Sequence, residues 1–567
     1  MKKFLIGLVA GMLLAAIAGV VVFFAAVRLG ERRPGVPDGA TLFLRLEGEL
    51  PEQPPVEVPF FGPPPHATVR DTWEVLGRAA GDARIRALVL MPRSLGAGWA
   101  KLDELRQSIL AFKKSGKPVY AFLRNPGTRE YYAASAADRV YMPPEDFLDV
   151  KGLRAEVMFL RGGLDKLGVE VEIEHAGKYK DAGDMFTRTS MSPETREVLD
   201  LALDQIYGRL VATIAEARRK KPEEVQALID QGPFVPTRAK AAGLVDGLLY
   251  EDEVLAEIKR RLGQRDLKKI SHLDYLKAGR GGEGRRIALV AAQGSILRGA
   301  ASGLGDEDTI RSESFIKLLR QVGDDKSFRG VIVRVDSPGG DALASDDILR
   351  EMKLLSRKKP LVVSFSDVAA SGGYYIAMTG DPVVAYPETQ TGSIGVIYGK
   401  LNLRRLYDKL GIRKDILIRG RFAAIDSDYQ PLSPDGRGKL RESIDHVYRS
   451  FLARVAEGRK KKPEEIEPLA QGRVWMGAQA RERGLVDALG GLDTAVQLVK
   501  QRAGMGKDEK VQLVAYPGRR GILDYLAARR APAVFDERLA RMLGDFDLRL
   551  WTRGGLMRVM PYSIRIH

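Results

Sequence analysis

The chain contains an internal duplication, which constrains its fold more than any other feature. An apolar strand-length run, a turn, a stretch of helical character and a second strand occupy residues 85–123 and recur at residues 328–365. Tyr131-Tyr132 then lies 243 positions before Tyr374-Tyr375. Strands that alternate with helices pair mostly in parallel and are covered by those helices. The sequence therefore predicts two related α/β domains in tandem. The four expected strands are residues 85–92, 117–123, 328–335 and 359–365.

The repeat continues to the end of each half. Gly243–Asp246 (GLVD) recurs at Gly484–Asp487, and the basic runs 218–221 and 459–462 are each followed by Pro-Glu-Glu. Cations near a helix C-terminus and then proline and acids in a first turn are typical of one helix ending where another begins. We therefore read the basic runs as helix ends rather than as a nucleic-acid surface, since no aromatic residues are interleaved with them.

Composition narrows the chemistry available to the chain. The 567 residues include no cysteine, which excludes disulfides, thiolate metal sites and a cysteine nucleophile. The five histidines are too scattered to form a local metal motif, and a histidine-based triad is not favoured. The net charge of +16 is consistent either with a solvated basic surface or with attraction to an anionic membrane. The histidines are His66, His175, His272, His446 and His567.

An uncharged apolar run from Phe4 to Val27 follows Lys2 and Lys3. Its 24 residues are enough to cross a hydrocarbon core, which needs about 20. The sequence thus predicts an N-terminal membrane anchor. The alternative is a cleaved signal peptide, because small residues near the end of the run, Ala25 and Ala26, are compatible with cleavage.

The second half carries two turns that suggest a nucleophile. Ser337–Gly340 (SPGG) directly follows one expected strand, and Ala369–Tyr375 (AASGGYY) follows the next. Such turns can expose backbone N–H groups that stabilise an oxyanion, and Ser371 would start a helix. The alternative for Ser371 is a helix N-cap, a common role for serine. The pair of turns, one per strand, is more specific than either alone.

A serine nucleophile needs a base, and with no suitable histidine a lysine is the next candidate. Burial can lower the pKa of a lysine until it is neutral near pH 7. Gly177–Lys180 in the first half corresponds to Gly420–Ala423 in the second, whereas Ser371 corresponds to Thr128. Each half therefore keeps one part of a single site, Lys180 or Ser371. The alternative for Lys180 is an ordinary surface lysine.

These motifs together resemble the protease IV family of signal peptide peptidase A in its long bacterial form. The resemblance covers nearly the whole chain, and its specific pieces are SPGG at 337–340, AASGGYY at 369–375, TGSIGV at 391–396, GKYKDAG at 177–183 and MSPETRE at 191–197. It implies two tandem Clp protease/crotonase-like domains after one N-terminal transmembrane helix. The expected ranges are an anchor (1–33), a tether or loop (34–66), a lysine-bearing domain (67–265), a linker (266–286), a serine-bearing domain (287–505) and a basic, amphipathic extension (506–567).

The resemblance also implies a reaction and a setting. Ser371 would attack a peptide carbonyl, Lys180 would act as general base, and Ser393 would orient Lys180. Amides of Gly339 and Gly372 would form the oxyanion hole, supported by Gly340 and Gly373. No cofactor or metal is expected. The substrates would be remnant signal peptides and other apolar peptides. The protein would be a homo-oligomer, a tetramer by resemblance, on the outer side of the cytoplasmic membrane, in contact with lipid and not with nucleic acid.

Two other functions remain open at the level of sequence. One is a crotonase-type acyl-CoA enzyme on the same fold, against which the pairing of Ser371 with Lys180 and the anchor both argue. The other is a membrane scaffold that has lost its chemistry, although such a scaffold would be expected to lose both parts of the dyad. Two segments are explained by no motif: Phe60–Pro65 (FFGPPP) and the basic tail from Gly518, which includes Leu523, Tyr525, Leu526, Arg529 and Arg530.

Overall fold

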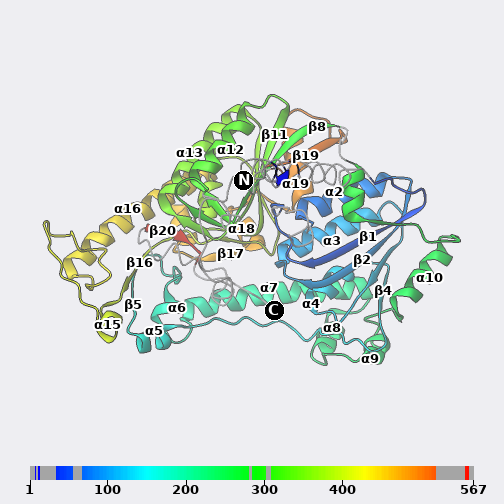
Figure 1. Cartoon of the computed structure of the whole chain (residues 1–567), viewed down its shortest axis with the longest axis horizontal. Helices are drawn as coiled ribbons and strands as arrows, with labels where there is room; N and C mark the ends of the chain where they lie inside the picture. The colour runs from blue at the N-terminus through cyan, green and yellow to red at the C-terminus, as the bar shows by residue number, and fades with distance from the viewer. Residues whose placement is uncertain are drawn as a thin grey trace.

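The computed structural model describes residues 34–54, 67–279, 284–301, 308–516 and 556–560, with isolated positions at 7, 11, 12, 14 and 518. Two sheet-and-helix units stand side by side, and an arm to which both halves contribute extends beside the second (Figure 1). Within the described residues no helix is both long enough and apolar enough to cross a membrane. The predicted anchor, residues 4–27, lies almost wholly outside them.

The first half is built on a parallel sheet of six strands in the order β6-β4-β3-β2-β1-β7. Two of its inner strands, β1 and β2, are largely apolar on both faces, as expected for strands covered by helices on each side. The strands are β1 (Ala40–Gly48), β2 (Ile85–Leu95), β3 (Val119–Phe122), β4 (Arg139–Met142), β6 (Gly247–Leu248) and β7 (Lys269–Ser271).

The second half repeats this topology. Its strands run in the order β18-β14-β13-β11-β8-β19, which matches the first sheet strand for strand, and all of these pairs are parallel. Beyond β13 the sheet also continues into β15 and β17. The predicted tandem duplication is therefore confirmed in mixed α/β form. The strands are β8 (Arg285–Gln293), β11 (Phe328–Ser337), β13 (Leu361–Ala370), β14 (Val383–Ala385), β15 (Gln390–Gly392), β17 (Val474–Met476), β18 (Ala488–Leu489) and β19 (Val511–Tyr516).

Helices cover these sheets and link their strands. The first half contains α2 (Val69–Gly81), α3 (Trp99–Lys113), α4 (Thr128–Ala134), α5 (Arg161–Leu167), α6 (Asp184–Thr187), α7 (Pro193–Arg218), α8 (Pro222–Ile229), α9 (Pro236–Ala241), α10 (Glu251–Arg261) and α11 (His272–Ala278). The second half contains α12 (Ser312–Asp324), α13 (Ala342–Lys358), α14 (Gly372–Ile376), α15 (Arg404–Lys409), α16 (Pro434–Arg459), α17 (Pro463–Ile466), the 3₁₀ helix η1 (Glu467–Leu469), α18 (Gly477–Glu482) and α19 (Leu492–Arg502).

The longest helices, α7 and α16, are repeat equivalents of 26 residues each. Both begin after a serine N-cap followed by proline, and both end in a residue with left-handed backbone, Arg219 or Lys460. The next helix then starts at Pro222 or Pro463. The interpretation of the two basic runs as helix ends is confirmed.

A third, mixed sheet joins the two halves. Its strands run in the order β10-β9-β12-β20-β16-β5. The β5 strand comes from the first half and pairs antiparallel over seven residues with β16 from the second. Together with α5, α15 and α16 these two strands form the arm at the left of Figure 1. The strands are β5 (Glu170–Ala176), β9 (Ser295–Leu297), β10 (Thr309–Arg311), β12 (Gly339–Asp341), β16 (Val396–Asn402) and β20 (Leu556–Val559).

Buried charge also holds the halves together. Arg334 on β11 is fully buried and donates to Glu52 at 3.1 Å and to Glu104 on α3 at 2.5 Å. The largest core cluster likewise takes in side chains of both halves, among them Leu42 and Ile332. The two halves therefore share one interior rather than being tethered as separate bodies.

The structure differs from the expected ranges in three places. The expected tether contains β1, a strand in the interior of the first sheet. The expected linker contains β7 and α11, which complete the first half. The expected C-terminal extension supplies β19 to the second sheet and β20 to the third. Residues 60–65 and 523–530 lie outside the described residues.

Candidate active site

The structure brings Lys180 and Ser371 together from opposite halves of the chain. Lys180 Nζ lies 2.8 Å from Ser371 Oγ and 2.9 Å from Ser393 Oγ, and it donates to the Ser393 carbonyl oxygen at 2.9 Å. All three side chains are fully buried. Lys180 follows β5, Ser371 follows β13, and Ser393 follows β15. The antiparallel pairing of β5 with β16 thus places Lys180 beside Ser371.

Lys180 is held where its charged form is disfavoured. Burial lowers its pKa well below the usual value of 10.5, and the nearby Arg558 guanidinium lowers it further, while Asp181 acts in the opposite direction. The alternative of an exposed surface lysine is therefore wrong. A neutral amine beside a serine hydroxyl is the arrangement that a lysine base requires.

Asp181, next to the lysine, is a buried carboxyl that the sequence reading did not single out. Burial raises its pKa to about 7. Thr195 Oγ1 donates to it, and Ser192 Oγ lies 2.8 Å from Thr195 Oγ1 at the start of α7. The sequence offered a clue to this contact, because Ser192 and Thr195 both belong to the MSPETRE motif at 191–197. These contacts fix the chain directly after Lys180.

Ser371 sits in a strained turn between β13 and α14. Its φ of 53° and ψ of −115° are unusual for a residue with a side chain. It occupies the N-cap position of α14, but its side chain makes no capping hydrogen bond. Its amide donates to the Gly392 carbonyl at 2.8 Å. The turn therefore directs Oγ to Lys180 instead of to the helix.

The two glycine turns of the second half meet beside Ser371. Gly339 has a φ of 102°, and a Cβ there would lie 2.1 Å from Arg558 O and 2.6 Å from Gly372 N. No other residue fits without displacing the backbone. Gly373 packs against Ser337, and Gly340 against Ile296 of β9. The predicted oxyanion-hole glycines are thus adjacent, although in this state the Gly339 amide donates to Ser337 Oγ at 3.2 Å.

A loop of the second half, residues 471–472, packs against the backbone of Lys180. The Tyr179 amide donates to the Gln471 carbonyl at 2.7 Å. Gly472, with a φ of 78°, packs so closely that a Cβ would lie 2.6 Å from the Lys180 backbone nitrogen. Neither residue belongs to a motif that sequence reasoning recognised. Their role depends on a contact between positions almost 300 residues apart, which one sequence does not reveal.

Lys101 of the first half reaches the strands that carry both turns. Its Nζ lies 2.6 Å from Asp336, the residue before SPGG, and 3.7 Å from Asp367 on β13. Asp367 also accepts the amides of Gly98 and Lys101 at the start of α3. Asp336 in turn accepts the amide of Val368 at 3.1 Å. The sequence analysis did not identify this cluster, which links α3 of the first half to the strands that precede the two turns.

The last described segment of the chain lies across the site. β20 pairs antiparallel with β12 on one side and with β16 on the other. The Met560 amide donates to the Pro338 carbonyl at 2.7 Å. Arg558 is buried, with its guanidinium 3.6 Å from the centre of the Tyr375 ring. The slot between β12 and β16 is therefore filled by an extended segment of the same chain.

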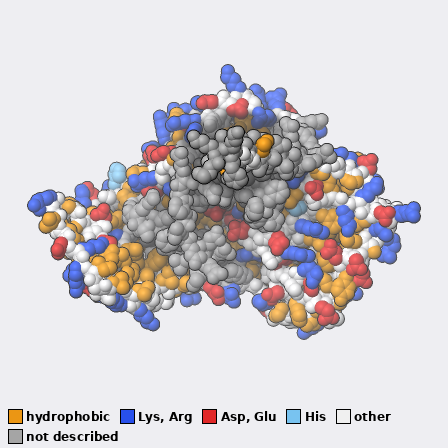
Figure 2. Space-filling view, viewed as in Figure 1, with side chains coloured by type: hydrophobic (Ala, Val, Ile, Leu, Met, Phe, Trp, Pro, Cys, Tyr) orange, Lys and Arg blue, Asp and Glu red, His pale blue; other side chains and the backbone are white. Residues whose placement is uncertain are grey.

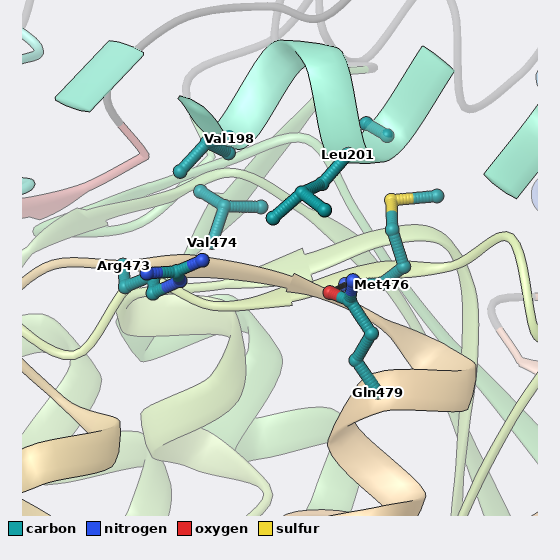
Figure 3. A pocket seen from close by; sticks show the side chains of 7 residues that line it. Val198, Leu201, Arg473, Val474, Met476 and Gln479 are labelled. Carbon is teal, nitrogen blue, oxygen red and sulfur yellow. Dashed lines mark hydrogen bonds between the residues drawn. The ribbon is translucent and has the colours of Figure 1, made fainter. Parts of the chain in front are cut away.

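An apolar pocket adjoins this slot. Figure 3 shows Val198 and Leu201 of α7 facing Val474 and Met476 of β17, with Arg473 and Gln479 at its sides. Val198 and Val474 also pack with Ala370 and Met560 in one apolar cluster, which reaches the residue before Ser371. The surroundings of Ser371 on this side are therefore apolar.

Thr128 and Ala423, the repeat equivalents of Ser371 and Lys180, form no such pair. Thr128 begins α4 of the first half, and Ala423 lies in an exposed surface turn of the second. The structure therefore contains one lysine–serine pair per chain, in the part of the chain described.

Comparison with known proteins identifies the class. The chain matches peptidase family S49 twice, at residues 111–265 and 353–506. It is 40% identical over 446 residues to the chloroplastic serine protease SPPA of Arabidopsis thaliana, covering 77% of this chain and 66% of that protein, just under two thirds. It is 32% identical to Protease 4 of Salmonella typhi (75% of this chain, 70% of that protein) and 31% to Protease 4 of Haemophilus influenzae (77% and 73%).

The duplicated α/β fold and these matches define a serine protease. The chain belongs to peptidase family S49.

Proposed function

We propose that the protein is a membrane-anchored serine endopeptidase with Ser371 as nucleophile and Lys180 as general base. The observation that carries this proposal is the 2.8 Å contact between Lys180 Nζ and Ser371 Oγ in a fully buried site. Reaction with a fluorophosphonate probe tests it, since such probes label activated serines. Labelling of Ser371 is expected, together with cleavage of an apolar signal peptide.

The geometry of Lys180 and Ser371 supports the following reaction. Neutral Lys180 removes the proton from Ser371 Oγ as that oxygen attacks the peptide carbonyl carbon. The resulting ammonium then gives its proton to the leaving amine, which departs and leaves an acyl-serine. A water molecule, deprotonated by the same amine, then attacks the acyl carbon, the acid leaves, and the ammonium returns its proton to Ser371 Oγ. Ser393 keeps Nζ in position through two contacts at 2.9 Å.

Gly339 and Gly372 are proposed to stabilise the oxyanion. Their backbones adjoin each other beside the nucleophile, as an oxyanion hole requires. The Gly339 amide is engaged by Ser337 Oγ in a long bond of 3.2 Å. A developing negative charge is a stronger acceptor than a hydroxyl and would compete favourably for that amide.

The slot and pocket support an apolar, extended substrate. A peptide lying between β12 and β16 would gain backbone hydrogen bonds along both strands, as β20 does. Its side chains would meet the cluster around Val198 and Val474. We propose remnant signal peptides and other membrane-embedded apolar peptides as substrates. The enzyme would act as a homo-oligomer on the outer side of the cytoplasmic membrane, held beside lipid by residues 4–27.

The activity is expected to rise with pH and to reach a plateau far below pH 10.5. Only neutral Lys180 is a base, and its pKa in the folded protein is lowered by burial. Below that pKa, kcat/KM should fall about tenfold per pH unit. The rate of Ser371 labelling by the probe should show the same limb, whereas the KM should not. A limb centred near pH 10.5, or none, would remove Lys180 from the role of base.

Lys180 and Asp181 make the free energy of unfolding depend on pH in opposite directions. Folded Lys180 holds fewer protons than the unfolded side chain between its lowered pKa and 10.5, so it contributes stability that grows as pH rises through that window. Asp181, whose pKa is about 7 against 3.8 unfolded, contributes stability that is full at low pH and is lost as pH rises from 3.8 to 7.

Deleting residues 556–567 should lower the KM for peptides several-fold, because β20 occupies the slot that a substrate needs. Steady-state cleavage of an apolar peptide measures this. The matched control ends at Met560, retains β20 and should behave as the full chain. Unchanged probe labelling and thermal stability would show that the deletion leaves the fold intact. An intact deletion variant with unaltered KM would place the substrate elsewhere.

A further inference from the structure

The N-terminus of α3 is capped by the second half of the chain and not by its own side chain. Its N-cap residue is Gly98, which has no side chain to offer. The Asp367 carboxylate on β13 takes that role, accepting the Gly98 amide at 2.9 Å and the Lys101 amide at 3.0 Å. A Cβ on Gly98 would lie 2.4 Å from the Asp367 carboxyl carbon. The start of α3 is thus shaped to dock on β13.

The repeat equivalent of α3 shows that this arrangement is not a requirement of the fold. α13 begins 243 positions later, and its N-cap is Asp341. The Asp341 carboxylate accepts the amides of Leu343 and Ala344 at 3.0 and 2.9 Å. A helix at this place in the repeat can therefore be capped within its own half.

The charged cluster of Lys101, Asp336 and Asp367 is likewise confined to one of the two repeats. At the offset of 243 positions its members correspond to an alanine and two arginines, so no ion pair of this kind can form at the equivalent place. The corresponding residues are Ala344, Arg93 and Arg124. Both halves nonetheless form sheets with the same strand order. The cluster is therefore not needed for the fold, and it lies beside the half that carries Ser371.

The two aspartates lie where β11 and β13 are out of register. Between two opposed pairs β13 advances four residues while β11 advances two. Those pairs are Val335 with Phe365 and Ser337 with Ala369. Irregularities of this kind redirect the chain and are common beside active sites. Here one strand continues into Ser337–Gly340 and the other into Ser371, so this bulge sets how the two turns meet.

Lys101 supplies a buried positive charge to this bulge. Figure 2 shows Lys and Arg side chains spread over the visible face of the molecule, whereas the Lys101 side chain is only 10% exposed. Its ammonium lies 2.6 Å from Asp336 and 3.7 Å from Asp367. Burial by itself would lower the pKa of Lys101, but these carboxylates outweigh it and raise the pKa. Lys101 is therefore a cation throughout the neutral range.

We propose that Lys101 is a positioning residue for the protease reaction: its ammonium fixes the ends of β11 and β13 and so sets the spacing between the Gly339 and Gly372 amides. This inference rests on the proposed function, since it concerns the oxyanion hole proposed for Ser371. Because Lys101 belongs to α3, the oxyanion hole of the second half would depend on contact with the first half.

The closeness of the two glycine turns makes this spacing sensitive. A Cβ on Gly339 would lie only 2.6 Å from Gly372 N, so the two backbones are in contact. Asp336 lies three residues before Gly339, and its carboxylate also accepts the Val368 amide at 3.1 Å. A misplacement of about 1 Å at a reacting centre can lower the rate about 100-fold. Loss of Lys101 leaves two carboxylates to repel each other inside the bulge and should move both strand ends.

Lys101→Met in the full-length protein is therefore expected to lower kcat for an apolar signal peptide about 100-fold, with little change in KM. The acid limb of the pH profile should stay that of the parent, because the pKa of Lys180 is set by burial, Asp181 and Arg558. A simple loss of folded enzyme would lower the concentration of active sites and leave the turnover of each site unchanged. Titration of active sites with the fluorophosphonate probe gives kcat per site and separates the two cases.

A pair of matched inhibitors reads the oxyanion hole itself. A peptide aldehyde adds reversibly to a serine hydroxyl and places an oxyanion in the hole, whereas the peptide alcohol of the same sequence only binds. Lys101→Met should weaken inhibition by the aldehyde about as much as it lowers kcat, and should leave inhibition by the alcohol unchanged. Equal effects on both inhibitors would show a general disturbance of the site and would overturn the proposal.

Two further variants complete the test. Lys113→Met changes a second lysine of α3, which contacts Asp138 and the Ala136 carbonyl away from the site, and should keep the activity of the parent. Asp336→Asn retains an acceptor for the Val368 amide and should reproduce the loss of kcat even if Lys101→Met folds poorly. The double variant should be no worse than either single one, because the two side chains act as a pair.

The outcomes separate this inference from the proposed function. If the parent is active and both Lys101→Met and Asp336→Asn retain its kcat, Lys101 is not a positioning residue, while the roles of Ser371 and Lys180 stand. If the parent itself neither cleaves nor reacts with the probe, both proposals fall together.

Discussion

Replacing Ser371 or Lys180 with alanine is expected to lower kcat by about 10⁴-fold or more, with the folded structure retained. Members of a nucleophile–base pair act as a unit, so losing either one costs about as much as losing both. Ser371→Ala removes the oxygen that is proposed to attack the substrate. Lys180→Ala removes the amine that lies 2.8 Å from it. Steady-state cleavage of an apolar signal peptide and serine-probe labelling both measure the loss.

Two further variants sharpen this experiment. Lys180→Arg keeps a long cation but cannot deprotonate, so it should be as inactive as the alanine variant. Thr128→Ala, at the repeat position equivalent to Ser371, should keep full activity. Substantial activity in Lys180→Ala would show that another group is the base. If the parent protein neither cleaves nor labels, the inactive scaffold becomes the better description.

Replacing Arg334 with methionine is expected to destabilise the protein by about 3–5 kcal/mol, the usual cost of breaking a buried ion pair by removing one partner. The guanidinium is fully buried and satisfies Glu52 and Glu104 while also donating to Ser364. Without it, two carboxylates from the first half face each other in the interior. Burial already raises the pKa of Glu104, and the loss of Arg334 removes the charge that opposes this.

Thermal unfolding measures the effect. The melting temperature of Arg334→Met should fall by several degrees, and by less at low pH, where the Glu104 carboxyl, whose pKa is raised by burial, protonates. Adding Glu52→Gln and Glu104→Gln should recover part of the loss. Lys358→Met breaks a surface pair with Asp324 and should change little, since both partners are exposed. Equal losses for the buried and surface variants would contradict the assigned role of Arg334.

The sequence predicted the duplicated α/β fold because the repeat conserves the order of strands, turns and helices. It also pointed to Lys180 and Ser371, since each half lacks the part that the other retains. In the structure Gly339 and Gly372 adjoin each other beside Ser371, and Ser393 contacts Lys180, while their roles in catalysis stay predictions. Local patterns and one internal comparison were enough for these features.

Other features depend on contacts that no local pattern encodes. β1 is apolar, but prolines flank it, and its neighbours β2 and β7 lie far apart in the sequence. β20 follows a long basic tail and returns to the site through pairing with β12. Gly472 is needed because Lys180 packs against it from the other half. In each case the deciding partner is hundreds of residues away.

The joining of β5 to β16 has a consequence for the order of events during synthesis. Lys180 and Ser371 are 191 residues apart, and the lysine emerges first. Domains generally fold from the N-terminus as the chain is made. While only the first half has been made, the chain therefore holds the proposed base, Lys180, without the proposed nucleophile. On the proposed mechanism the chain stays inactive until Ser371 has been made and β16 has paired with β5, so an incomplete copy would not digest its neighbours.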